Sequence, residues 1–142
     1  MKDHKAIPVP GVTLTHLPRI TDWRGDLTFM EFPGLLPFQP RRMFMLYNVP
    51  TKDIRGEHAH KELHQFLICV QGRCSVVVED ARNRCAVHLD KPTLGLYIPP
   101  MIWAIEYRFT QNAVLVVLAS DIYKPDDYIR SYDEYLDLVA RR

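Results

Sequence analysis

Short apolar segments alternate with polar turn residues over most of the chain. Gln71-Gly72-Arg73 separates two of these segments, at residues 64–70 and 74–79, and this pattern predicts a β-hairpin. Many short strands joined by frequent turns indicate an all-β sandwich or barrel. The strands expected from the pattern are residues 27–32, 43–49, 64–70, 74–79, 85–89, 95–98, 103–109 and 113–120.

The two ends of the chain have different patterns. Residues 1–11 contain two prolines and little periodicity, which predicts an N-terminal arm or a first edge strand. Near the C-terminus, Pro125 supplies a residue typical of a first helical turn. Apolar residues then recur at three-to-four spacing, which predicts a short C-terminal helix over about residues 125–140.

Composition narrows the class of protein. The chain has 142 residues, of which 47% are hydrophobic and 25% charged, as expected for one globular domain. Its formal net charge of +1 gives no reason to expect nucleic acid or a membrane as a partner. The N-terminus has no apolar signal-peptide core, and the three cysteines are typical of free thiols in a reducing compartment. We therefore expect a cytoplasmic protein.

The segment at residues 55–66 carries the most chemical information. Side chains two positions apart in a strand share a face, so His58 and His60 are predicted to point the same way. His64 would join them if the strand continued without a bulge. Two or three histidines on one face, next to Arg55, favour a functional pocket over isolated surface histidines.

This segment resembles the first motif of the cupin family, a His-x-His pair followed by a glutamate and then a glycine. His58, His60 and Gly72 match that motif, whereas Gln65 stands at the glutamate position. The resemblance implies that residues 1–142 form one cupin domain, a double-stranded β-helix or jelly roll.

The second cupin motif is a glycine, a proline and then a third metal-binding histidine. Gly95 and Pro99 match it, but Ala104 stands at the histidine position. The chain thus resembles a cupin that keeps two of the four usual metal ligands. His64 could replace a lost ligand, so a metal-dependent enzyme that uses His58, His60 and His64 is an alternative.

Without a metal, His58 and His60 are candidates for acid–base catalysis, because imidazole exchanges protons near neutral pH. A pair on one face can serve two adjacent carbons, which suits a proton shift next to a carbonyl through an enediol. Guanidinium groups at a barrel mouth suit a diphosphate, and the candidates are Arg24, Arg42 and Arg55. Three aromatic residues could stack on a base or sugar, although each also suits a core: Tyr97, Trp103 and Tyr132.

Four segments together resemble a narrower family, the sugar 3,4-ketoisomerases that act on dTDP-4-keto-6-deoxyglucose. Residues 55–61 are similar to its RGxHAHK motif, and residues 22–25 to its early D-x-R-G turn. Residues 95–103 resemble its GLYxPPxxW segment, and residues 118–132 its LASDxY…DYIRxY tail. The four motifs follow in the family's order and extend from about residue 12 to residue 138.

This resemblance implies a metal-free and cofactor-free isomerase that moves a ketone from carbon 4 to carbon 3 of a dTDP-linked hexose. A pyridoxal-phosphate enzyme would then aminate the product, for 3-amino-3,6-dideoxysugars of O-antigen, lipopolysaccharide and other glycans. The implied assembly is a homodimer that exchanges an N-terminal strand. His58 and His60 would be the acid–base pair, with His58 removing the carbon-3 proton. The implied substrate-binding set is Arg24, Arg42, Arg55, His64, Tyr97, Trp103, Ala104 and Tyr132.

Two positions depart from the family. Ala104 stands where members commonly have histidine or arginine, and Met45 where they often have tyrosine. The configuration of the product at carbon 4, gluco or galacto, therefore stays open. A non-catalytic dTDP-sugar-binding cupin is a further alternative. A carbon-3,5 epimerase is disfavoured by the HAHK and DYIR segments.

Overall fold

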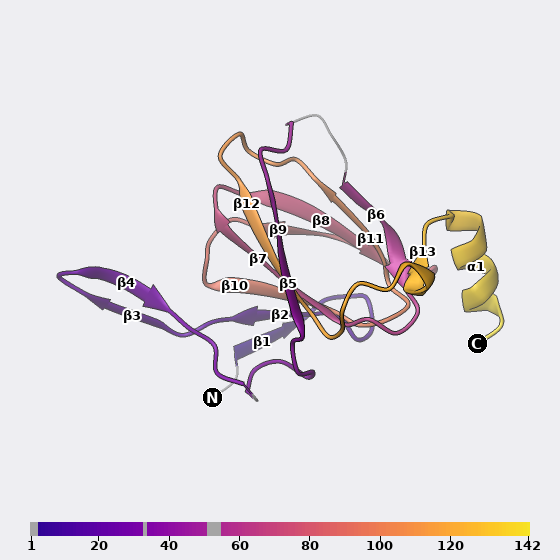
Figure 1. Cartoon of the computed structure of the whole chain (residues 1–142), viewed down its shortest axis with the longest axis horizontal. Helices are drawn as coiled ribbons and strands as arrows, with labels where there is room; N and C mark the ends of the chain where they lie inside the picture. The colour runs from indigo at the N-terminus through magenta and orange to yellow at the C-terminus, as the bar shows by residue number, and fades with distance from the viewer. Residues whose placement is uncertain (1–2, 33, 51–54) are drawn as a thin grey trace.

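The computed structural model describes residues 3–32, 34–50 and 55–142, and these residues form mainly β-strands (Figure 1). No helix in this part of the chain is long and apolar enough to cross a membrane. The elements are β1 (Asp3–Ala6), β2 (Thr13–His16), β3 (Arg19–Asp22), β4 (Gly25–Thr28), β5 (Arg42–Tyr47), β6 (Arg55–His60), β7 (Gln65–Gln71), β8 (Cys74–Glu79), β9 (Arg84–Leu89), β10 (Leu94–Ile98), β11 (Trp103–Tyr107), β12 (Val114–Ala119), a 3₁₀ turn η1 (Pro125–Asp127), β13 (Tyr128–Ile129) and α1 (Tyr132–Ala140).

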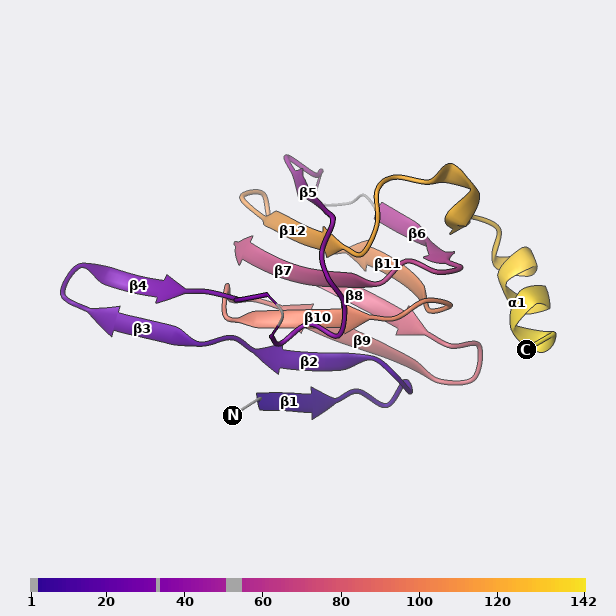
Figure 2. The same cartoon turned by 60° about the horizontal axis from the view of Figure 1, so that its bottom comes forward.

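Two antiparallel sheets face each other, as Figures 1 and 2 show. The larger sheet has the order β1-β2-β10-β7-β12-β5, and the smaller has the order β13-β6-β11-β8-β9. Their inner faces enclose one apolar core, which contains Leu67 of β7, Val117 of β12 and Val78 of β8. This arrangement confirms the predicted all-β double-stranded β-helix with a short C-terminal helix.

Buried and half-buried residues alternate along β12, so one face of the strand points into the core and the other points outward. Leu115, Val117 and Ala119 are fully buried between the sheets, whereas Val114 and Val116 lie on the outer face and are half-buried. Burying one such valine or leucine contributes about 1.5–3 kcal/mol. A register shift of one residue would turn this apolar row outward, so the pattern fixes the strand's orientation.

Both strands predicted around the turn at residues 71–73 are present, but they do not pair with each other as a hairpin. β7 pairs with β10 and β12, and β8 pairs with β11 and β9, so the chain crosses from one sheet to the other at this turn. Gly72 is required there, because its φ is +66° and an added Cβ would lie 2.3 Å from Thr110 Oγ1. Both strands are strongly apolar, so each buries its inner face by lying in opposite sheets rather than beside the other.

The predicted helix over residues 125–140 is correct only in its second half. Residues 125–127 form η1, and Tyr128 and Ile129 pair with His60 and Ala59 of β6 as β13. The helix begins at Tyr132, where Ser131 Oγ accepts the Glu134 backbone N–H at 3.2 Å. Because residues 128–129 pair with β6, they have an extended conformation and not the helical one that the apolar spacing predicts.

The N-terminal region is an edge strand followed by a projecting hairpin. β1 pairs with β2 at the edge of the larger sheet, as one of the two predictions for residues 1–11 stated. The predicted turn at residues 22–26 joins β3 to β4, but the strand expected at residues 27–32 is instead Gly25–Thr28. This hairpin extends away from the two sheets in Figure 1.

Candidate active site

Strand β6 presents His58 and His60 to the space between the two sheets. Ala59, between them, lies on the opposite face and packs with Trp103, Ile129 and other buried residues beneath α1. The prediction that both histidines share a face is confirmed, because their Nε2 atoms lie 3.0 Å apart. The two rings are nearly perpendicular, with an interplanar angle of 87°.

A carboxylate, that of Asp127, contacts the histidine pair through His60. His60 Nδ1 lies 3.0 Å from Asp127 Oδ2, so Asp127, His60 and His58 form a connected chain of polar atoms. Tyr128 covers the pair, with its ring centroid 4.4 Å from that of His60 and 5.0 Å from that of His58. Strand β13 therefore contributes a side wall to the site.

Burial and charge set the protonation of His60. Its side chain is 5% exposed, and this burial lowers the pKa of His60 below the ordinary histidine value. The Asp127 carboxylate acts in the opposite direction and raises that pKa, whereas the positive charges of Arg42 and Arg130 lower it further. The net lowering keeps the imidazole neutral at neutral pH, so it can accept a proton.

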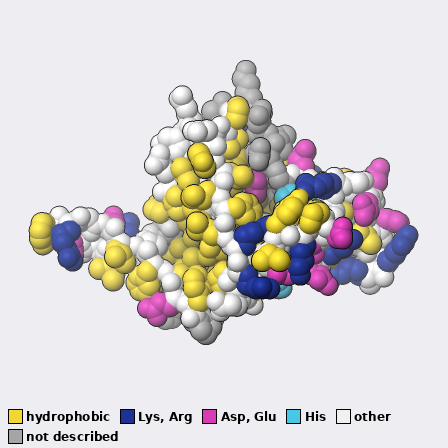
Figure 3. Space-filling model, viewed as in Figure 1, with side chains coloured by type: hydrophobic (Ala, Val, Ile, Leu, Met, Phe, Trp, Pro, Cys, Tyr) yellow, Lys and Arg dark blue, Asp and Glu magenta, His cyan; other side chains and the backbone are white. Residues whose placement is uncertain are grey.

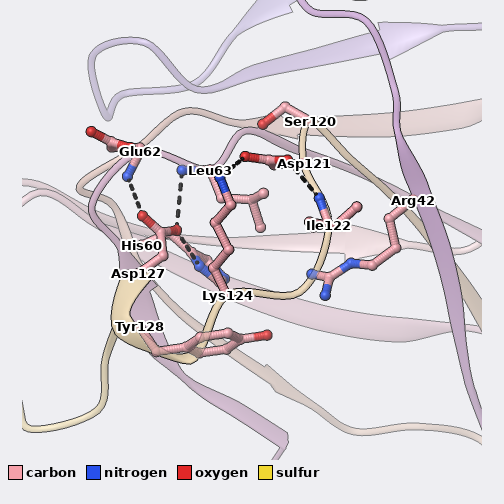
Figure 4. Close-up of a pocket in the computed structure, with 10 residues that line it drawn as sticks. All are labelled: Arg42, His60, Glu62, Leu63, Ser120, Asp121, Ile122, Lys124, Asp127 and Tyr128. Carbon is pink, nitrogen blue, oxygen red and sulfur yellow. Dashed lines mark hydrogen bonds and ion pairs between the residues drawn. The ribbon is translucent and has the colours of Figure 1, made fainter.

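A cavity of about 210 Å³ opens beside His60, between the edges of the two sheets (Figure 4). Arg42 of β5 extends into it, and Nε of Arg42 is a buried donor without a hydrogen-bond partner among the described residues. The guanidinium carbon lies 5.2 Å from the Phe44 ring centroid and 5.6 Å from that of Tyr123. The lining residues are Arg42, His60, Glu62, Leu63, Ser120, Asp121, Ile122, Lys124, Asp127 and Tyr128.

His64 does not join the pair. The strand ends after His60, and residues 61–64 link β6 of one sheet to β7 of the other. His64 Nδ1 lies 2.7 Å from the Tyr97 hydroxyl, and both rings stack on Phe38. Tyr97 and Phe38 pack with Phe66 on the other face of the larger sheet, away from the main core. Burial lowers the pKa of His64 and raises that of Tyr97.

The residues present do not fit a resident metal ion. Gln65 and Ala104 stand at two of the usual cupin ligand positions, and His64 lies in the separate cluster with Tyr97. Within residues 3–32, 34–50 and 55–142, no three histidine, cysteine or acidic side chains are grouped so that they could hold a metal. The alternative set of His58, His60 and His64 is therefore not assembled.

Trp103 of β11 lies on the outer face of the smaller sheet, and Tyr132 is the first residue of α1, which covers that face. The Trp103 ring is 5.3 Å from that of Tyr132 and 5.5 Å from that of Tyr135. Tyr132 also donates its hydroxyl to the Glu79 carboxylate. Since Ala59 and not the histidines faces this cluster, the structure does not bring Trp103 or Tyr132 to the histidine pair.

The remaining predicted residues have different positions. Ala104 is buried directly opposite His58 on the neighbouring strand β11. Arg24 is exposed at the tip of the β3–β4 hairpin, far from β6 in Figure 1, and pairs with Asp22 at 2.7 Å. The backbone of Arg55 belongs to β6, but its side chain lies outside the described residues. Met45 is 48% exposed on the outer face of β5.

Sequence reasoning missed several lining residues, among them Asp127, Tyr128 and Lys124. Asp127 lies 67 positions from His60 in the sequence, so no local spacing connects them. The signal available in the sequence is the DYIR segment, residues 127–130, which contains Asp127 and Tyr128.

The two facing sheets, with a His-x-His strand turned toward the space between them, define a double-stranded β-helix protein of the cupin type. Residues 10–140 match the family described as FdtA: WxcM-like, C-terminal, and the chain belongs to that family.

Three relatives agree with this assignment. The chain is 37% identical over 123 residues to a TDP-4-oxo-6-deoxy-alpha-D-glucose-3,4-oxoisomerase from Aneurinibacillus thermoaerophilus, covering 87% of this chain and 88% of the relative. A crystal structure of a 3,4-ketoisomerase from Helicobacter canadensis is 38% identical, with a TM-score of 0.89 over 92% of this chain and 98% of that one.

The third is a mutant 3,4-ketoisomerase from Thermoanaerobacterium thermosaccharolyticum in complex with TDP-4-keto-6-deoxyglucose. It is 36% identical, with a TM-score of 0.91 over 94% of this chain and 97% of that one. The predicted resemblance to the sugar 3,4-ketoisomerases is thus confirmed.

Proposed function

We propose that this protein is a nucleotide-sugar 3,4-ketoisomerase that converts dTDP-4-keto-6-deoxyglucose to a dTDP-3-keto-6-deoxyhexose. The observation that carries the proposal is the hydrogen-bonded His58–His60 pair, whose His60 lines a cavity, in a chain whose relatives are named as 3,4-ketoisomerases. The product has the ketone that a transaminase needs to make a 3-amino-3,6-dideoxysugar.

The reaction requires two proton transfers at carbon and two at oxygen. His58 removes the carbon-3 proton, the C3–H electrons form the C3=C4 double bond, and the former carbonyl oxygen at carbon 4 gains a proton. In the second half, the carbon-3 hydroxyl loses its proton and becomes the ketone, while carbon 4 receives a proton. The sugar is neither oxidised nor reduced overall, so this chemistry needs no redox cofactor, and we propose that it proceeds without a metal.

Arg42 supports the negative charge that develops on the substrate. Its side chain extends into the cavity beside His60, where the guanidinium group could donate to an enediolate oxygen. Donors fixed in place before the reaction stabilise such an oxyanion without reorganisation. We therefore assign Arg42 to the carbonyl oxygen rather than to the distant end of the nucleotide.

The cavity is suited to the sugar and not to the whole nucleotide sugar. Its volume of about 210 Å³ is below the roughly 300–1,000 Å³ of pockets that enclose drug-sized ligands. The diphosphate and thymidine would therefore extend beyond it. Arg24 and Arg55 remain our candidates for the diphosphate, and Tyr97 for a contact with the nucleotide.

The proposed assembly is a homodimer. Apolar side chains cover the outer face of β5 and continue onto β12 and β7, as the broad hydrophobic area in Figure 3 shows. An apolar surface of this kind is typical of an interface. The projecting β3–β4 hairpin could then reach a second copy and bring Arg24 to that copy's site. We also infer a cytoplasmic location, since Cys69, Cys74 and Cys85 are free thiols.

Ala104 leads to a proposal about the product. Its methyl group, buried opposite His58, cannot donate a proton, so in our mechanism the histidine pair serves both carbon 3 and carbon 4. A single pair delivers the proton to the same face of the ring from which it removed one. In the glucose series, hydrogens 3 and 4 lie on opposite faces, so delivery to the same face inverts carbon 4. We therefore expect the galacto configuration.

The test is proton NMR of dTDP-4-keto-6-deoxyglucose incubated in deuterated water with the chelator-treated protein. We expect loss of the carbon-3 proton signal, growth of a 3-keto product and a carbon-4 configuration of the galacto type. The variant H58N should reduce exchange by about 10²–10⁴-fold, because it removes the base. The matched variant H88N, whose exposed histidine lies on β9 and is hydrogen-bonded to Ser75 at 2.8 Å, should keep carbon-3 exchange. Binding of the nucleotide sugar without exchange or product would refute the isomerase and leave a binding protein.

A further inference from the structure

Asp127 lies directly behind the histidine pair. Its Oδ2 atom is 3.0 Å from His60 Nδ1, and the two side chains are only 14% and 5% exposed. A hydrogen bond to a carboxylate is shorter and stronger than one between neutral groups. In this shielded position it fixes the orientation of the His60 ring.

The turn after β6 holds the carboxylate in place, as the dashed lines in Figure 4 show. The backbone N–H of Glu62 donates to Oδ1 at 2.8 Å, and that of Leu63 donates to Oδ2 at 3.2 Å. The backbone N–H of Lys61 donates to the Asp127 carbonyl oxygen at 2.9 Å. Both carboxylate oxygens thus face donors, which suits an ionised carboxylate that only accepts hydrogen bonds.

This arrangement determines which nitrogen of His60 carries the proton. A neutral imidazole has one N–H and one lone pair, and Asp127 requires the N–H at Nδ1. The lone pair of His60 is therefore at Nε2, which lies 3.0 Å from His58 Nε2. The hydrogen bond between the two rings then runs from His58 to His60.

We infer that Asp127 is a positioning residue that holds His60 in its Nδ1–H form, so that His60 can take and return a proton through His58. The inference rests on the proposed acid–base role of the pair. When His58 receives the carbon-3 proton, its own Nε2 proton can pass to His60 Nε2. The resulting His60 imidazolium is stabilised by the Asp127 carboxylate, and the same proton returns before carbon 4 is protonated.

Several charged or titratable groups surround His60 from the elements packed against it. Asp127 from η1 raises the pKa of His60, whereas burial, Arg42 from β5 and Arg130 after β13 lower it. Removing the carboxylate should therefore lower the pKa of His60 further. His58 contacts the His60 ring directly, and the other charged or titratable groups that line the cavity are Glu62, Asp121, Lys124 and Tyr128.

The first test compares D127N with D126N, an adjacent exposed aspartate with the same change of charge. We expect D127N to lower kcat for carbon-3 exchange by on the order of 10²-fold with little change in KM. We also expect the acid limb of its kcat–pH profile to move to lower pH, because the carboxylate that raises the pKa of His60 is gone. D126N should match the wild type in both respects.

The second test needs no substrate. Nitrogen-15 NMR of the histidine rings distinguishes the two neutral forms, and the H60N variant assigns the His60 signals. The wild type should carry the His60 proton on Nδ1, and D127N should lose this preference. A wild-type His60 protonated on Nε2 at neutral pH would overturn the inference.

The two measurements separate this inference from the proposed function. If the wild type does not exchange carbon-3 hydrogen, the isomerase proposal fails, while the NMR experiment still decides the role of Asp127 at His60. If the wild type is active and D127N retains its kcat and pH midpoint, the positioning role is wrong. It is equally wrong if D127N loses activity uniformly at every pH without a change of His60 tautomer, since that pattern indicates a structural role.

Discussion

At the scale of single residues, Arg42 carries the clearest unmet interaction in the described part of the chain. Its Nε donor is buried beside the cavity without a partner there, whereas its neighbour Arg41 pairs at the surface with Asp121 at 2.9 Å. An unsatisfied buried donor costs about 1–3 kcal/mol, more when it is charged. A substrate oxygen that accepts a hydrogen bond from the guanidinium group in the cavity would offset part of that cost.

The variant R42M tests this role. Methionine preserves much of the packing against Phe44 and Tyr123 but removes the charge and every N–H donor. We expect kcat/KM to fall by about 10²–10³-fold, because one oxyanion donor is lost. R41M is the control, since its exposed ion pair contributes about 0–1 kcal/mol. A loss of similar size in R41M would indicate a general effect of surface charge instead.

The histidine pair could be predicted because its geometry is local. Residues i and i+2 of any strand share a face, and His58 and His60 needed no further information. Asp127 could not be predicted in the same way, because only the pairing of β13 with β6 brings it to His60. His64 illustrates the opposite error, since a strand break between it and His60 removes the expected shared face.

At the scale of elements, β13 and α1 hold the outer wall of the site. Ile129 of β13 is fully buried against Ala59, the residue between the two histidines. Apolar spacing predicted one helix here because it records which side chains are buried but not what they pack against. In the structure, Ile129 is buried as part of a strand and Tyr135 as part of the helix.

Tyr135 fastens α1 to the smaller sheet. It is fully buried, and its hydroxyl lies 3.0 Å from the Glu79 and Met101 carbonyl oxygens. Burial raises the pKa of Tyr135 to about 12, so the hydroxyl keeps its proton and donates. We expect Y135F to lower the free energy of unfolding by about 1 kcal/mol, measured by urea denaturation, because it leaves these carbonyl oxygens without this donor.

Y132F is the matched comparison, because the Tyr132 side chain belongs to the same helix but is 39% exposed. Water can replace its hydroxyl at the Glu79 carboxylate, so the loss of stability should be smaller. A larger loss in Y132F than in Y135F would contradict the proposed anchoring by Tyr135. In both variants, kcat per folded molecule should stay near that of the wild type, since neither hydroxyl reaches the histidine pair.

At the scale of the whole molecule, two features have no role within a single chain: the projecting β3–β4 hairpin and the exposed apolar face of β5. The β3–β4 hairpin extends away from the sheets with Ile20, Trp23 and Leu27 exposed, and Trp23 is 93% exposed. The outer face of β5 exposes further large apolar side chains. The sequence motif at Arg24 suggests a role at the substrate, yet the β3–β4 hairpin that carries Arg24 lies far from β6 within one chain (Figure 1). In the proposed homodimer Arg24 would reach the site of a second copy, and residue patterns within one chain do not predict such a contact.

A homodimer would account for both features and is testable at Met45. This residue lies opposite Val116 on β12, which in turn lies opposite Ile68 on β7, so an apolar row crosses the outer face of three strands. M45E would place an unpaired charge in that row and should weaken association by about 10²-fold, measured by sedimentation equilibrium. Catalysis should fall together with dimer content, because the hairpin that carries Arg24 would no longer reach a second copy.

The control L136E introduces the same charge on exposed α1, at 37% exposure, and should leave both properties unchanged. A fully active M45E monomer would show instead that each chain holds a complete site, and would remove Arg24 from the substrate-binding set.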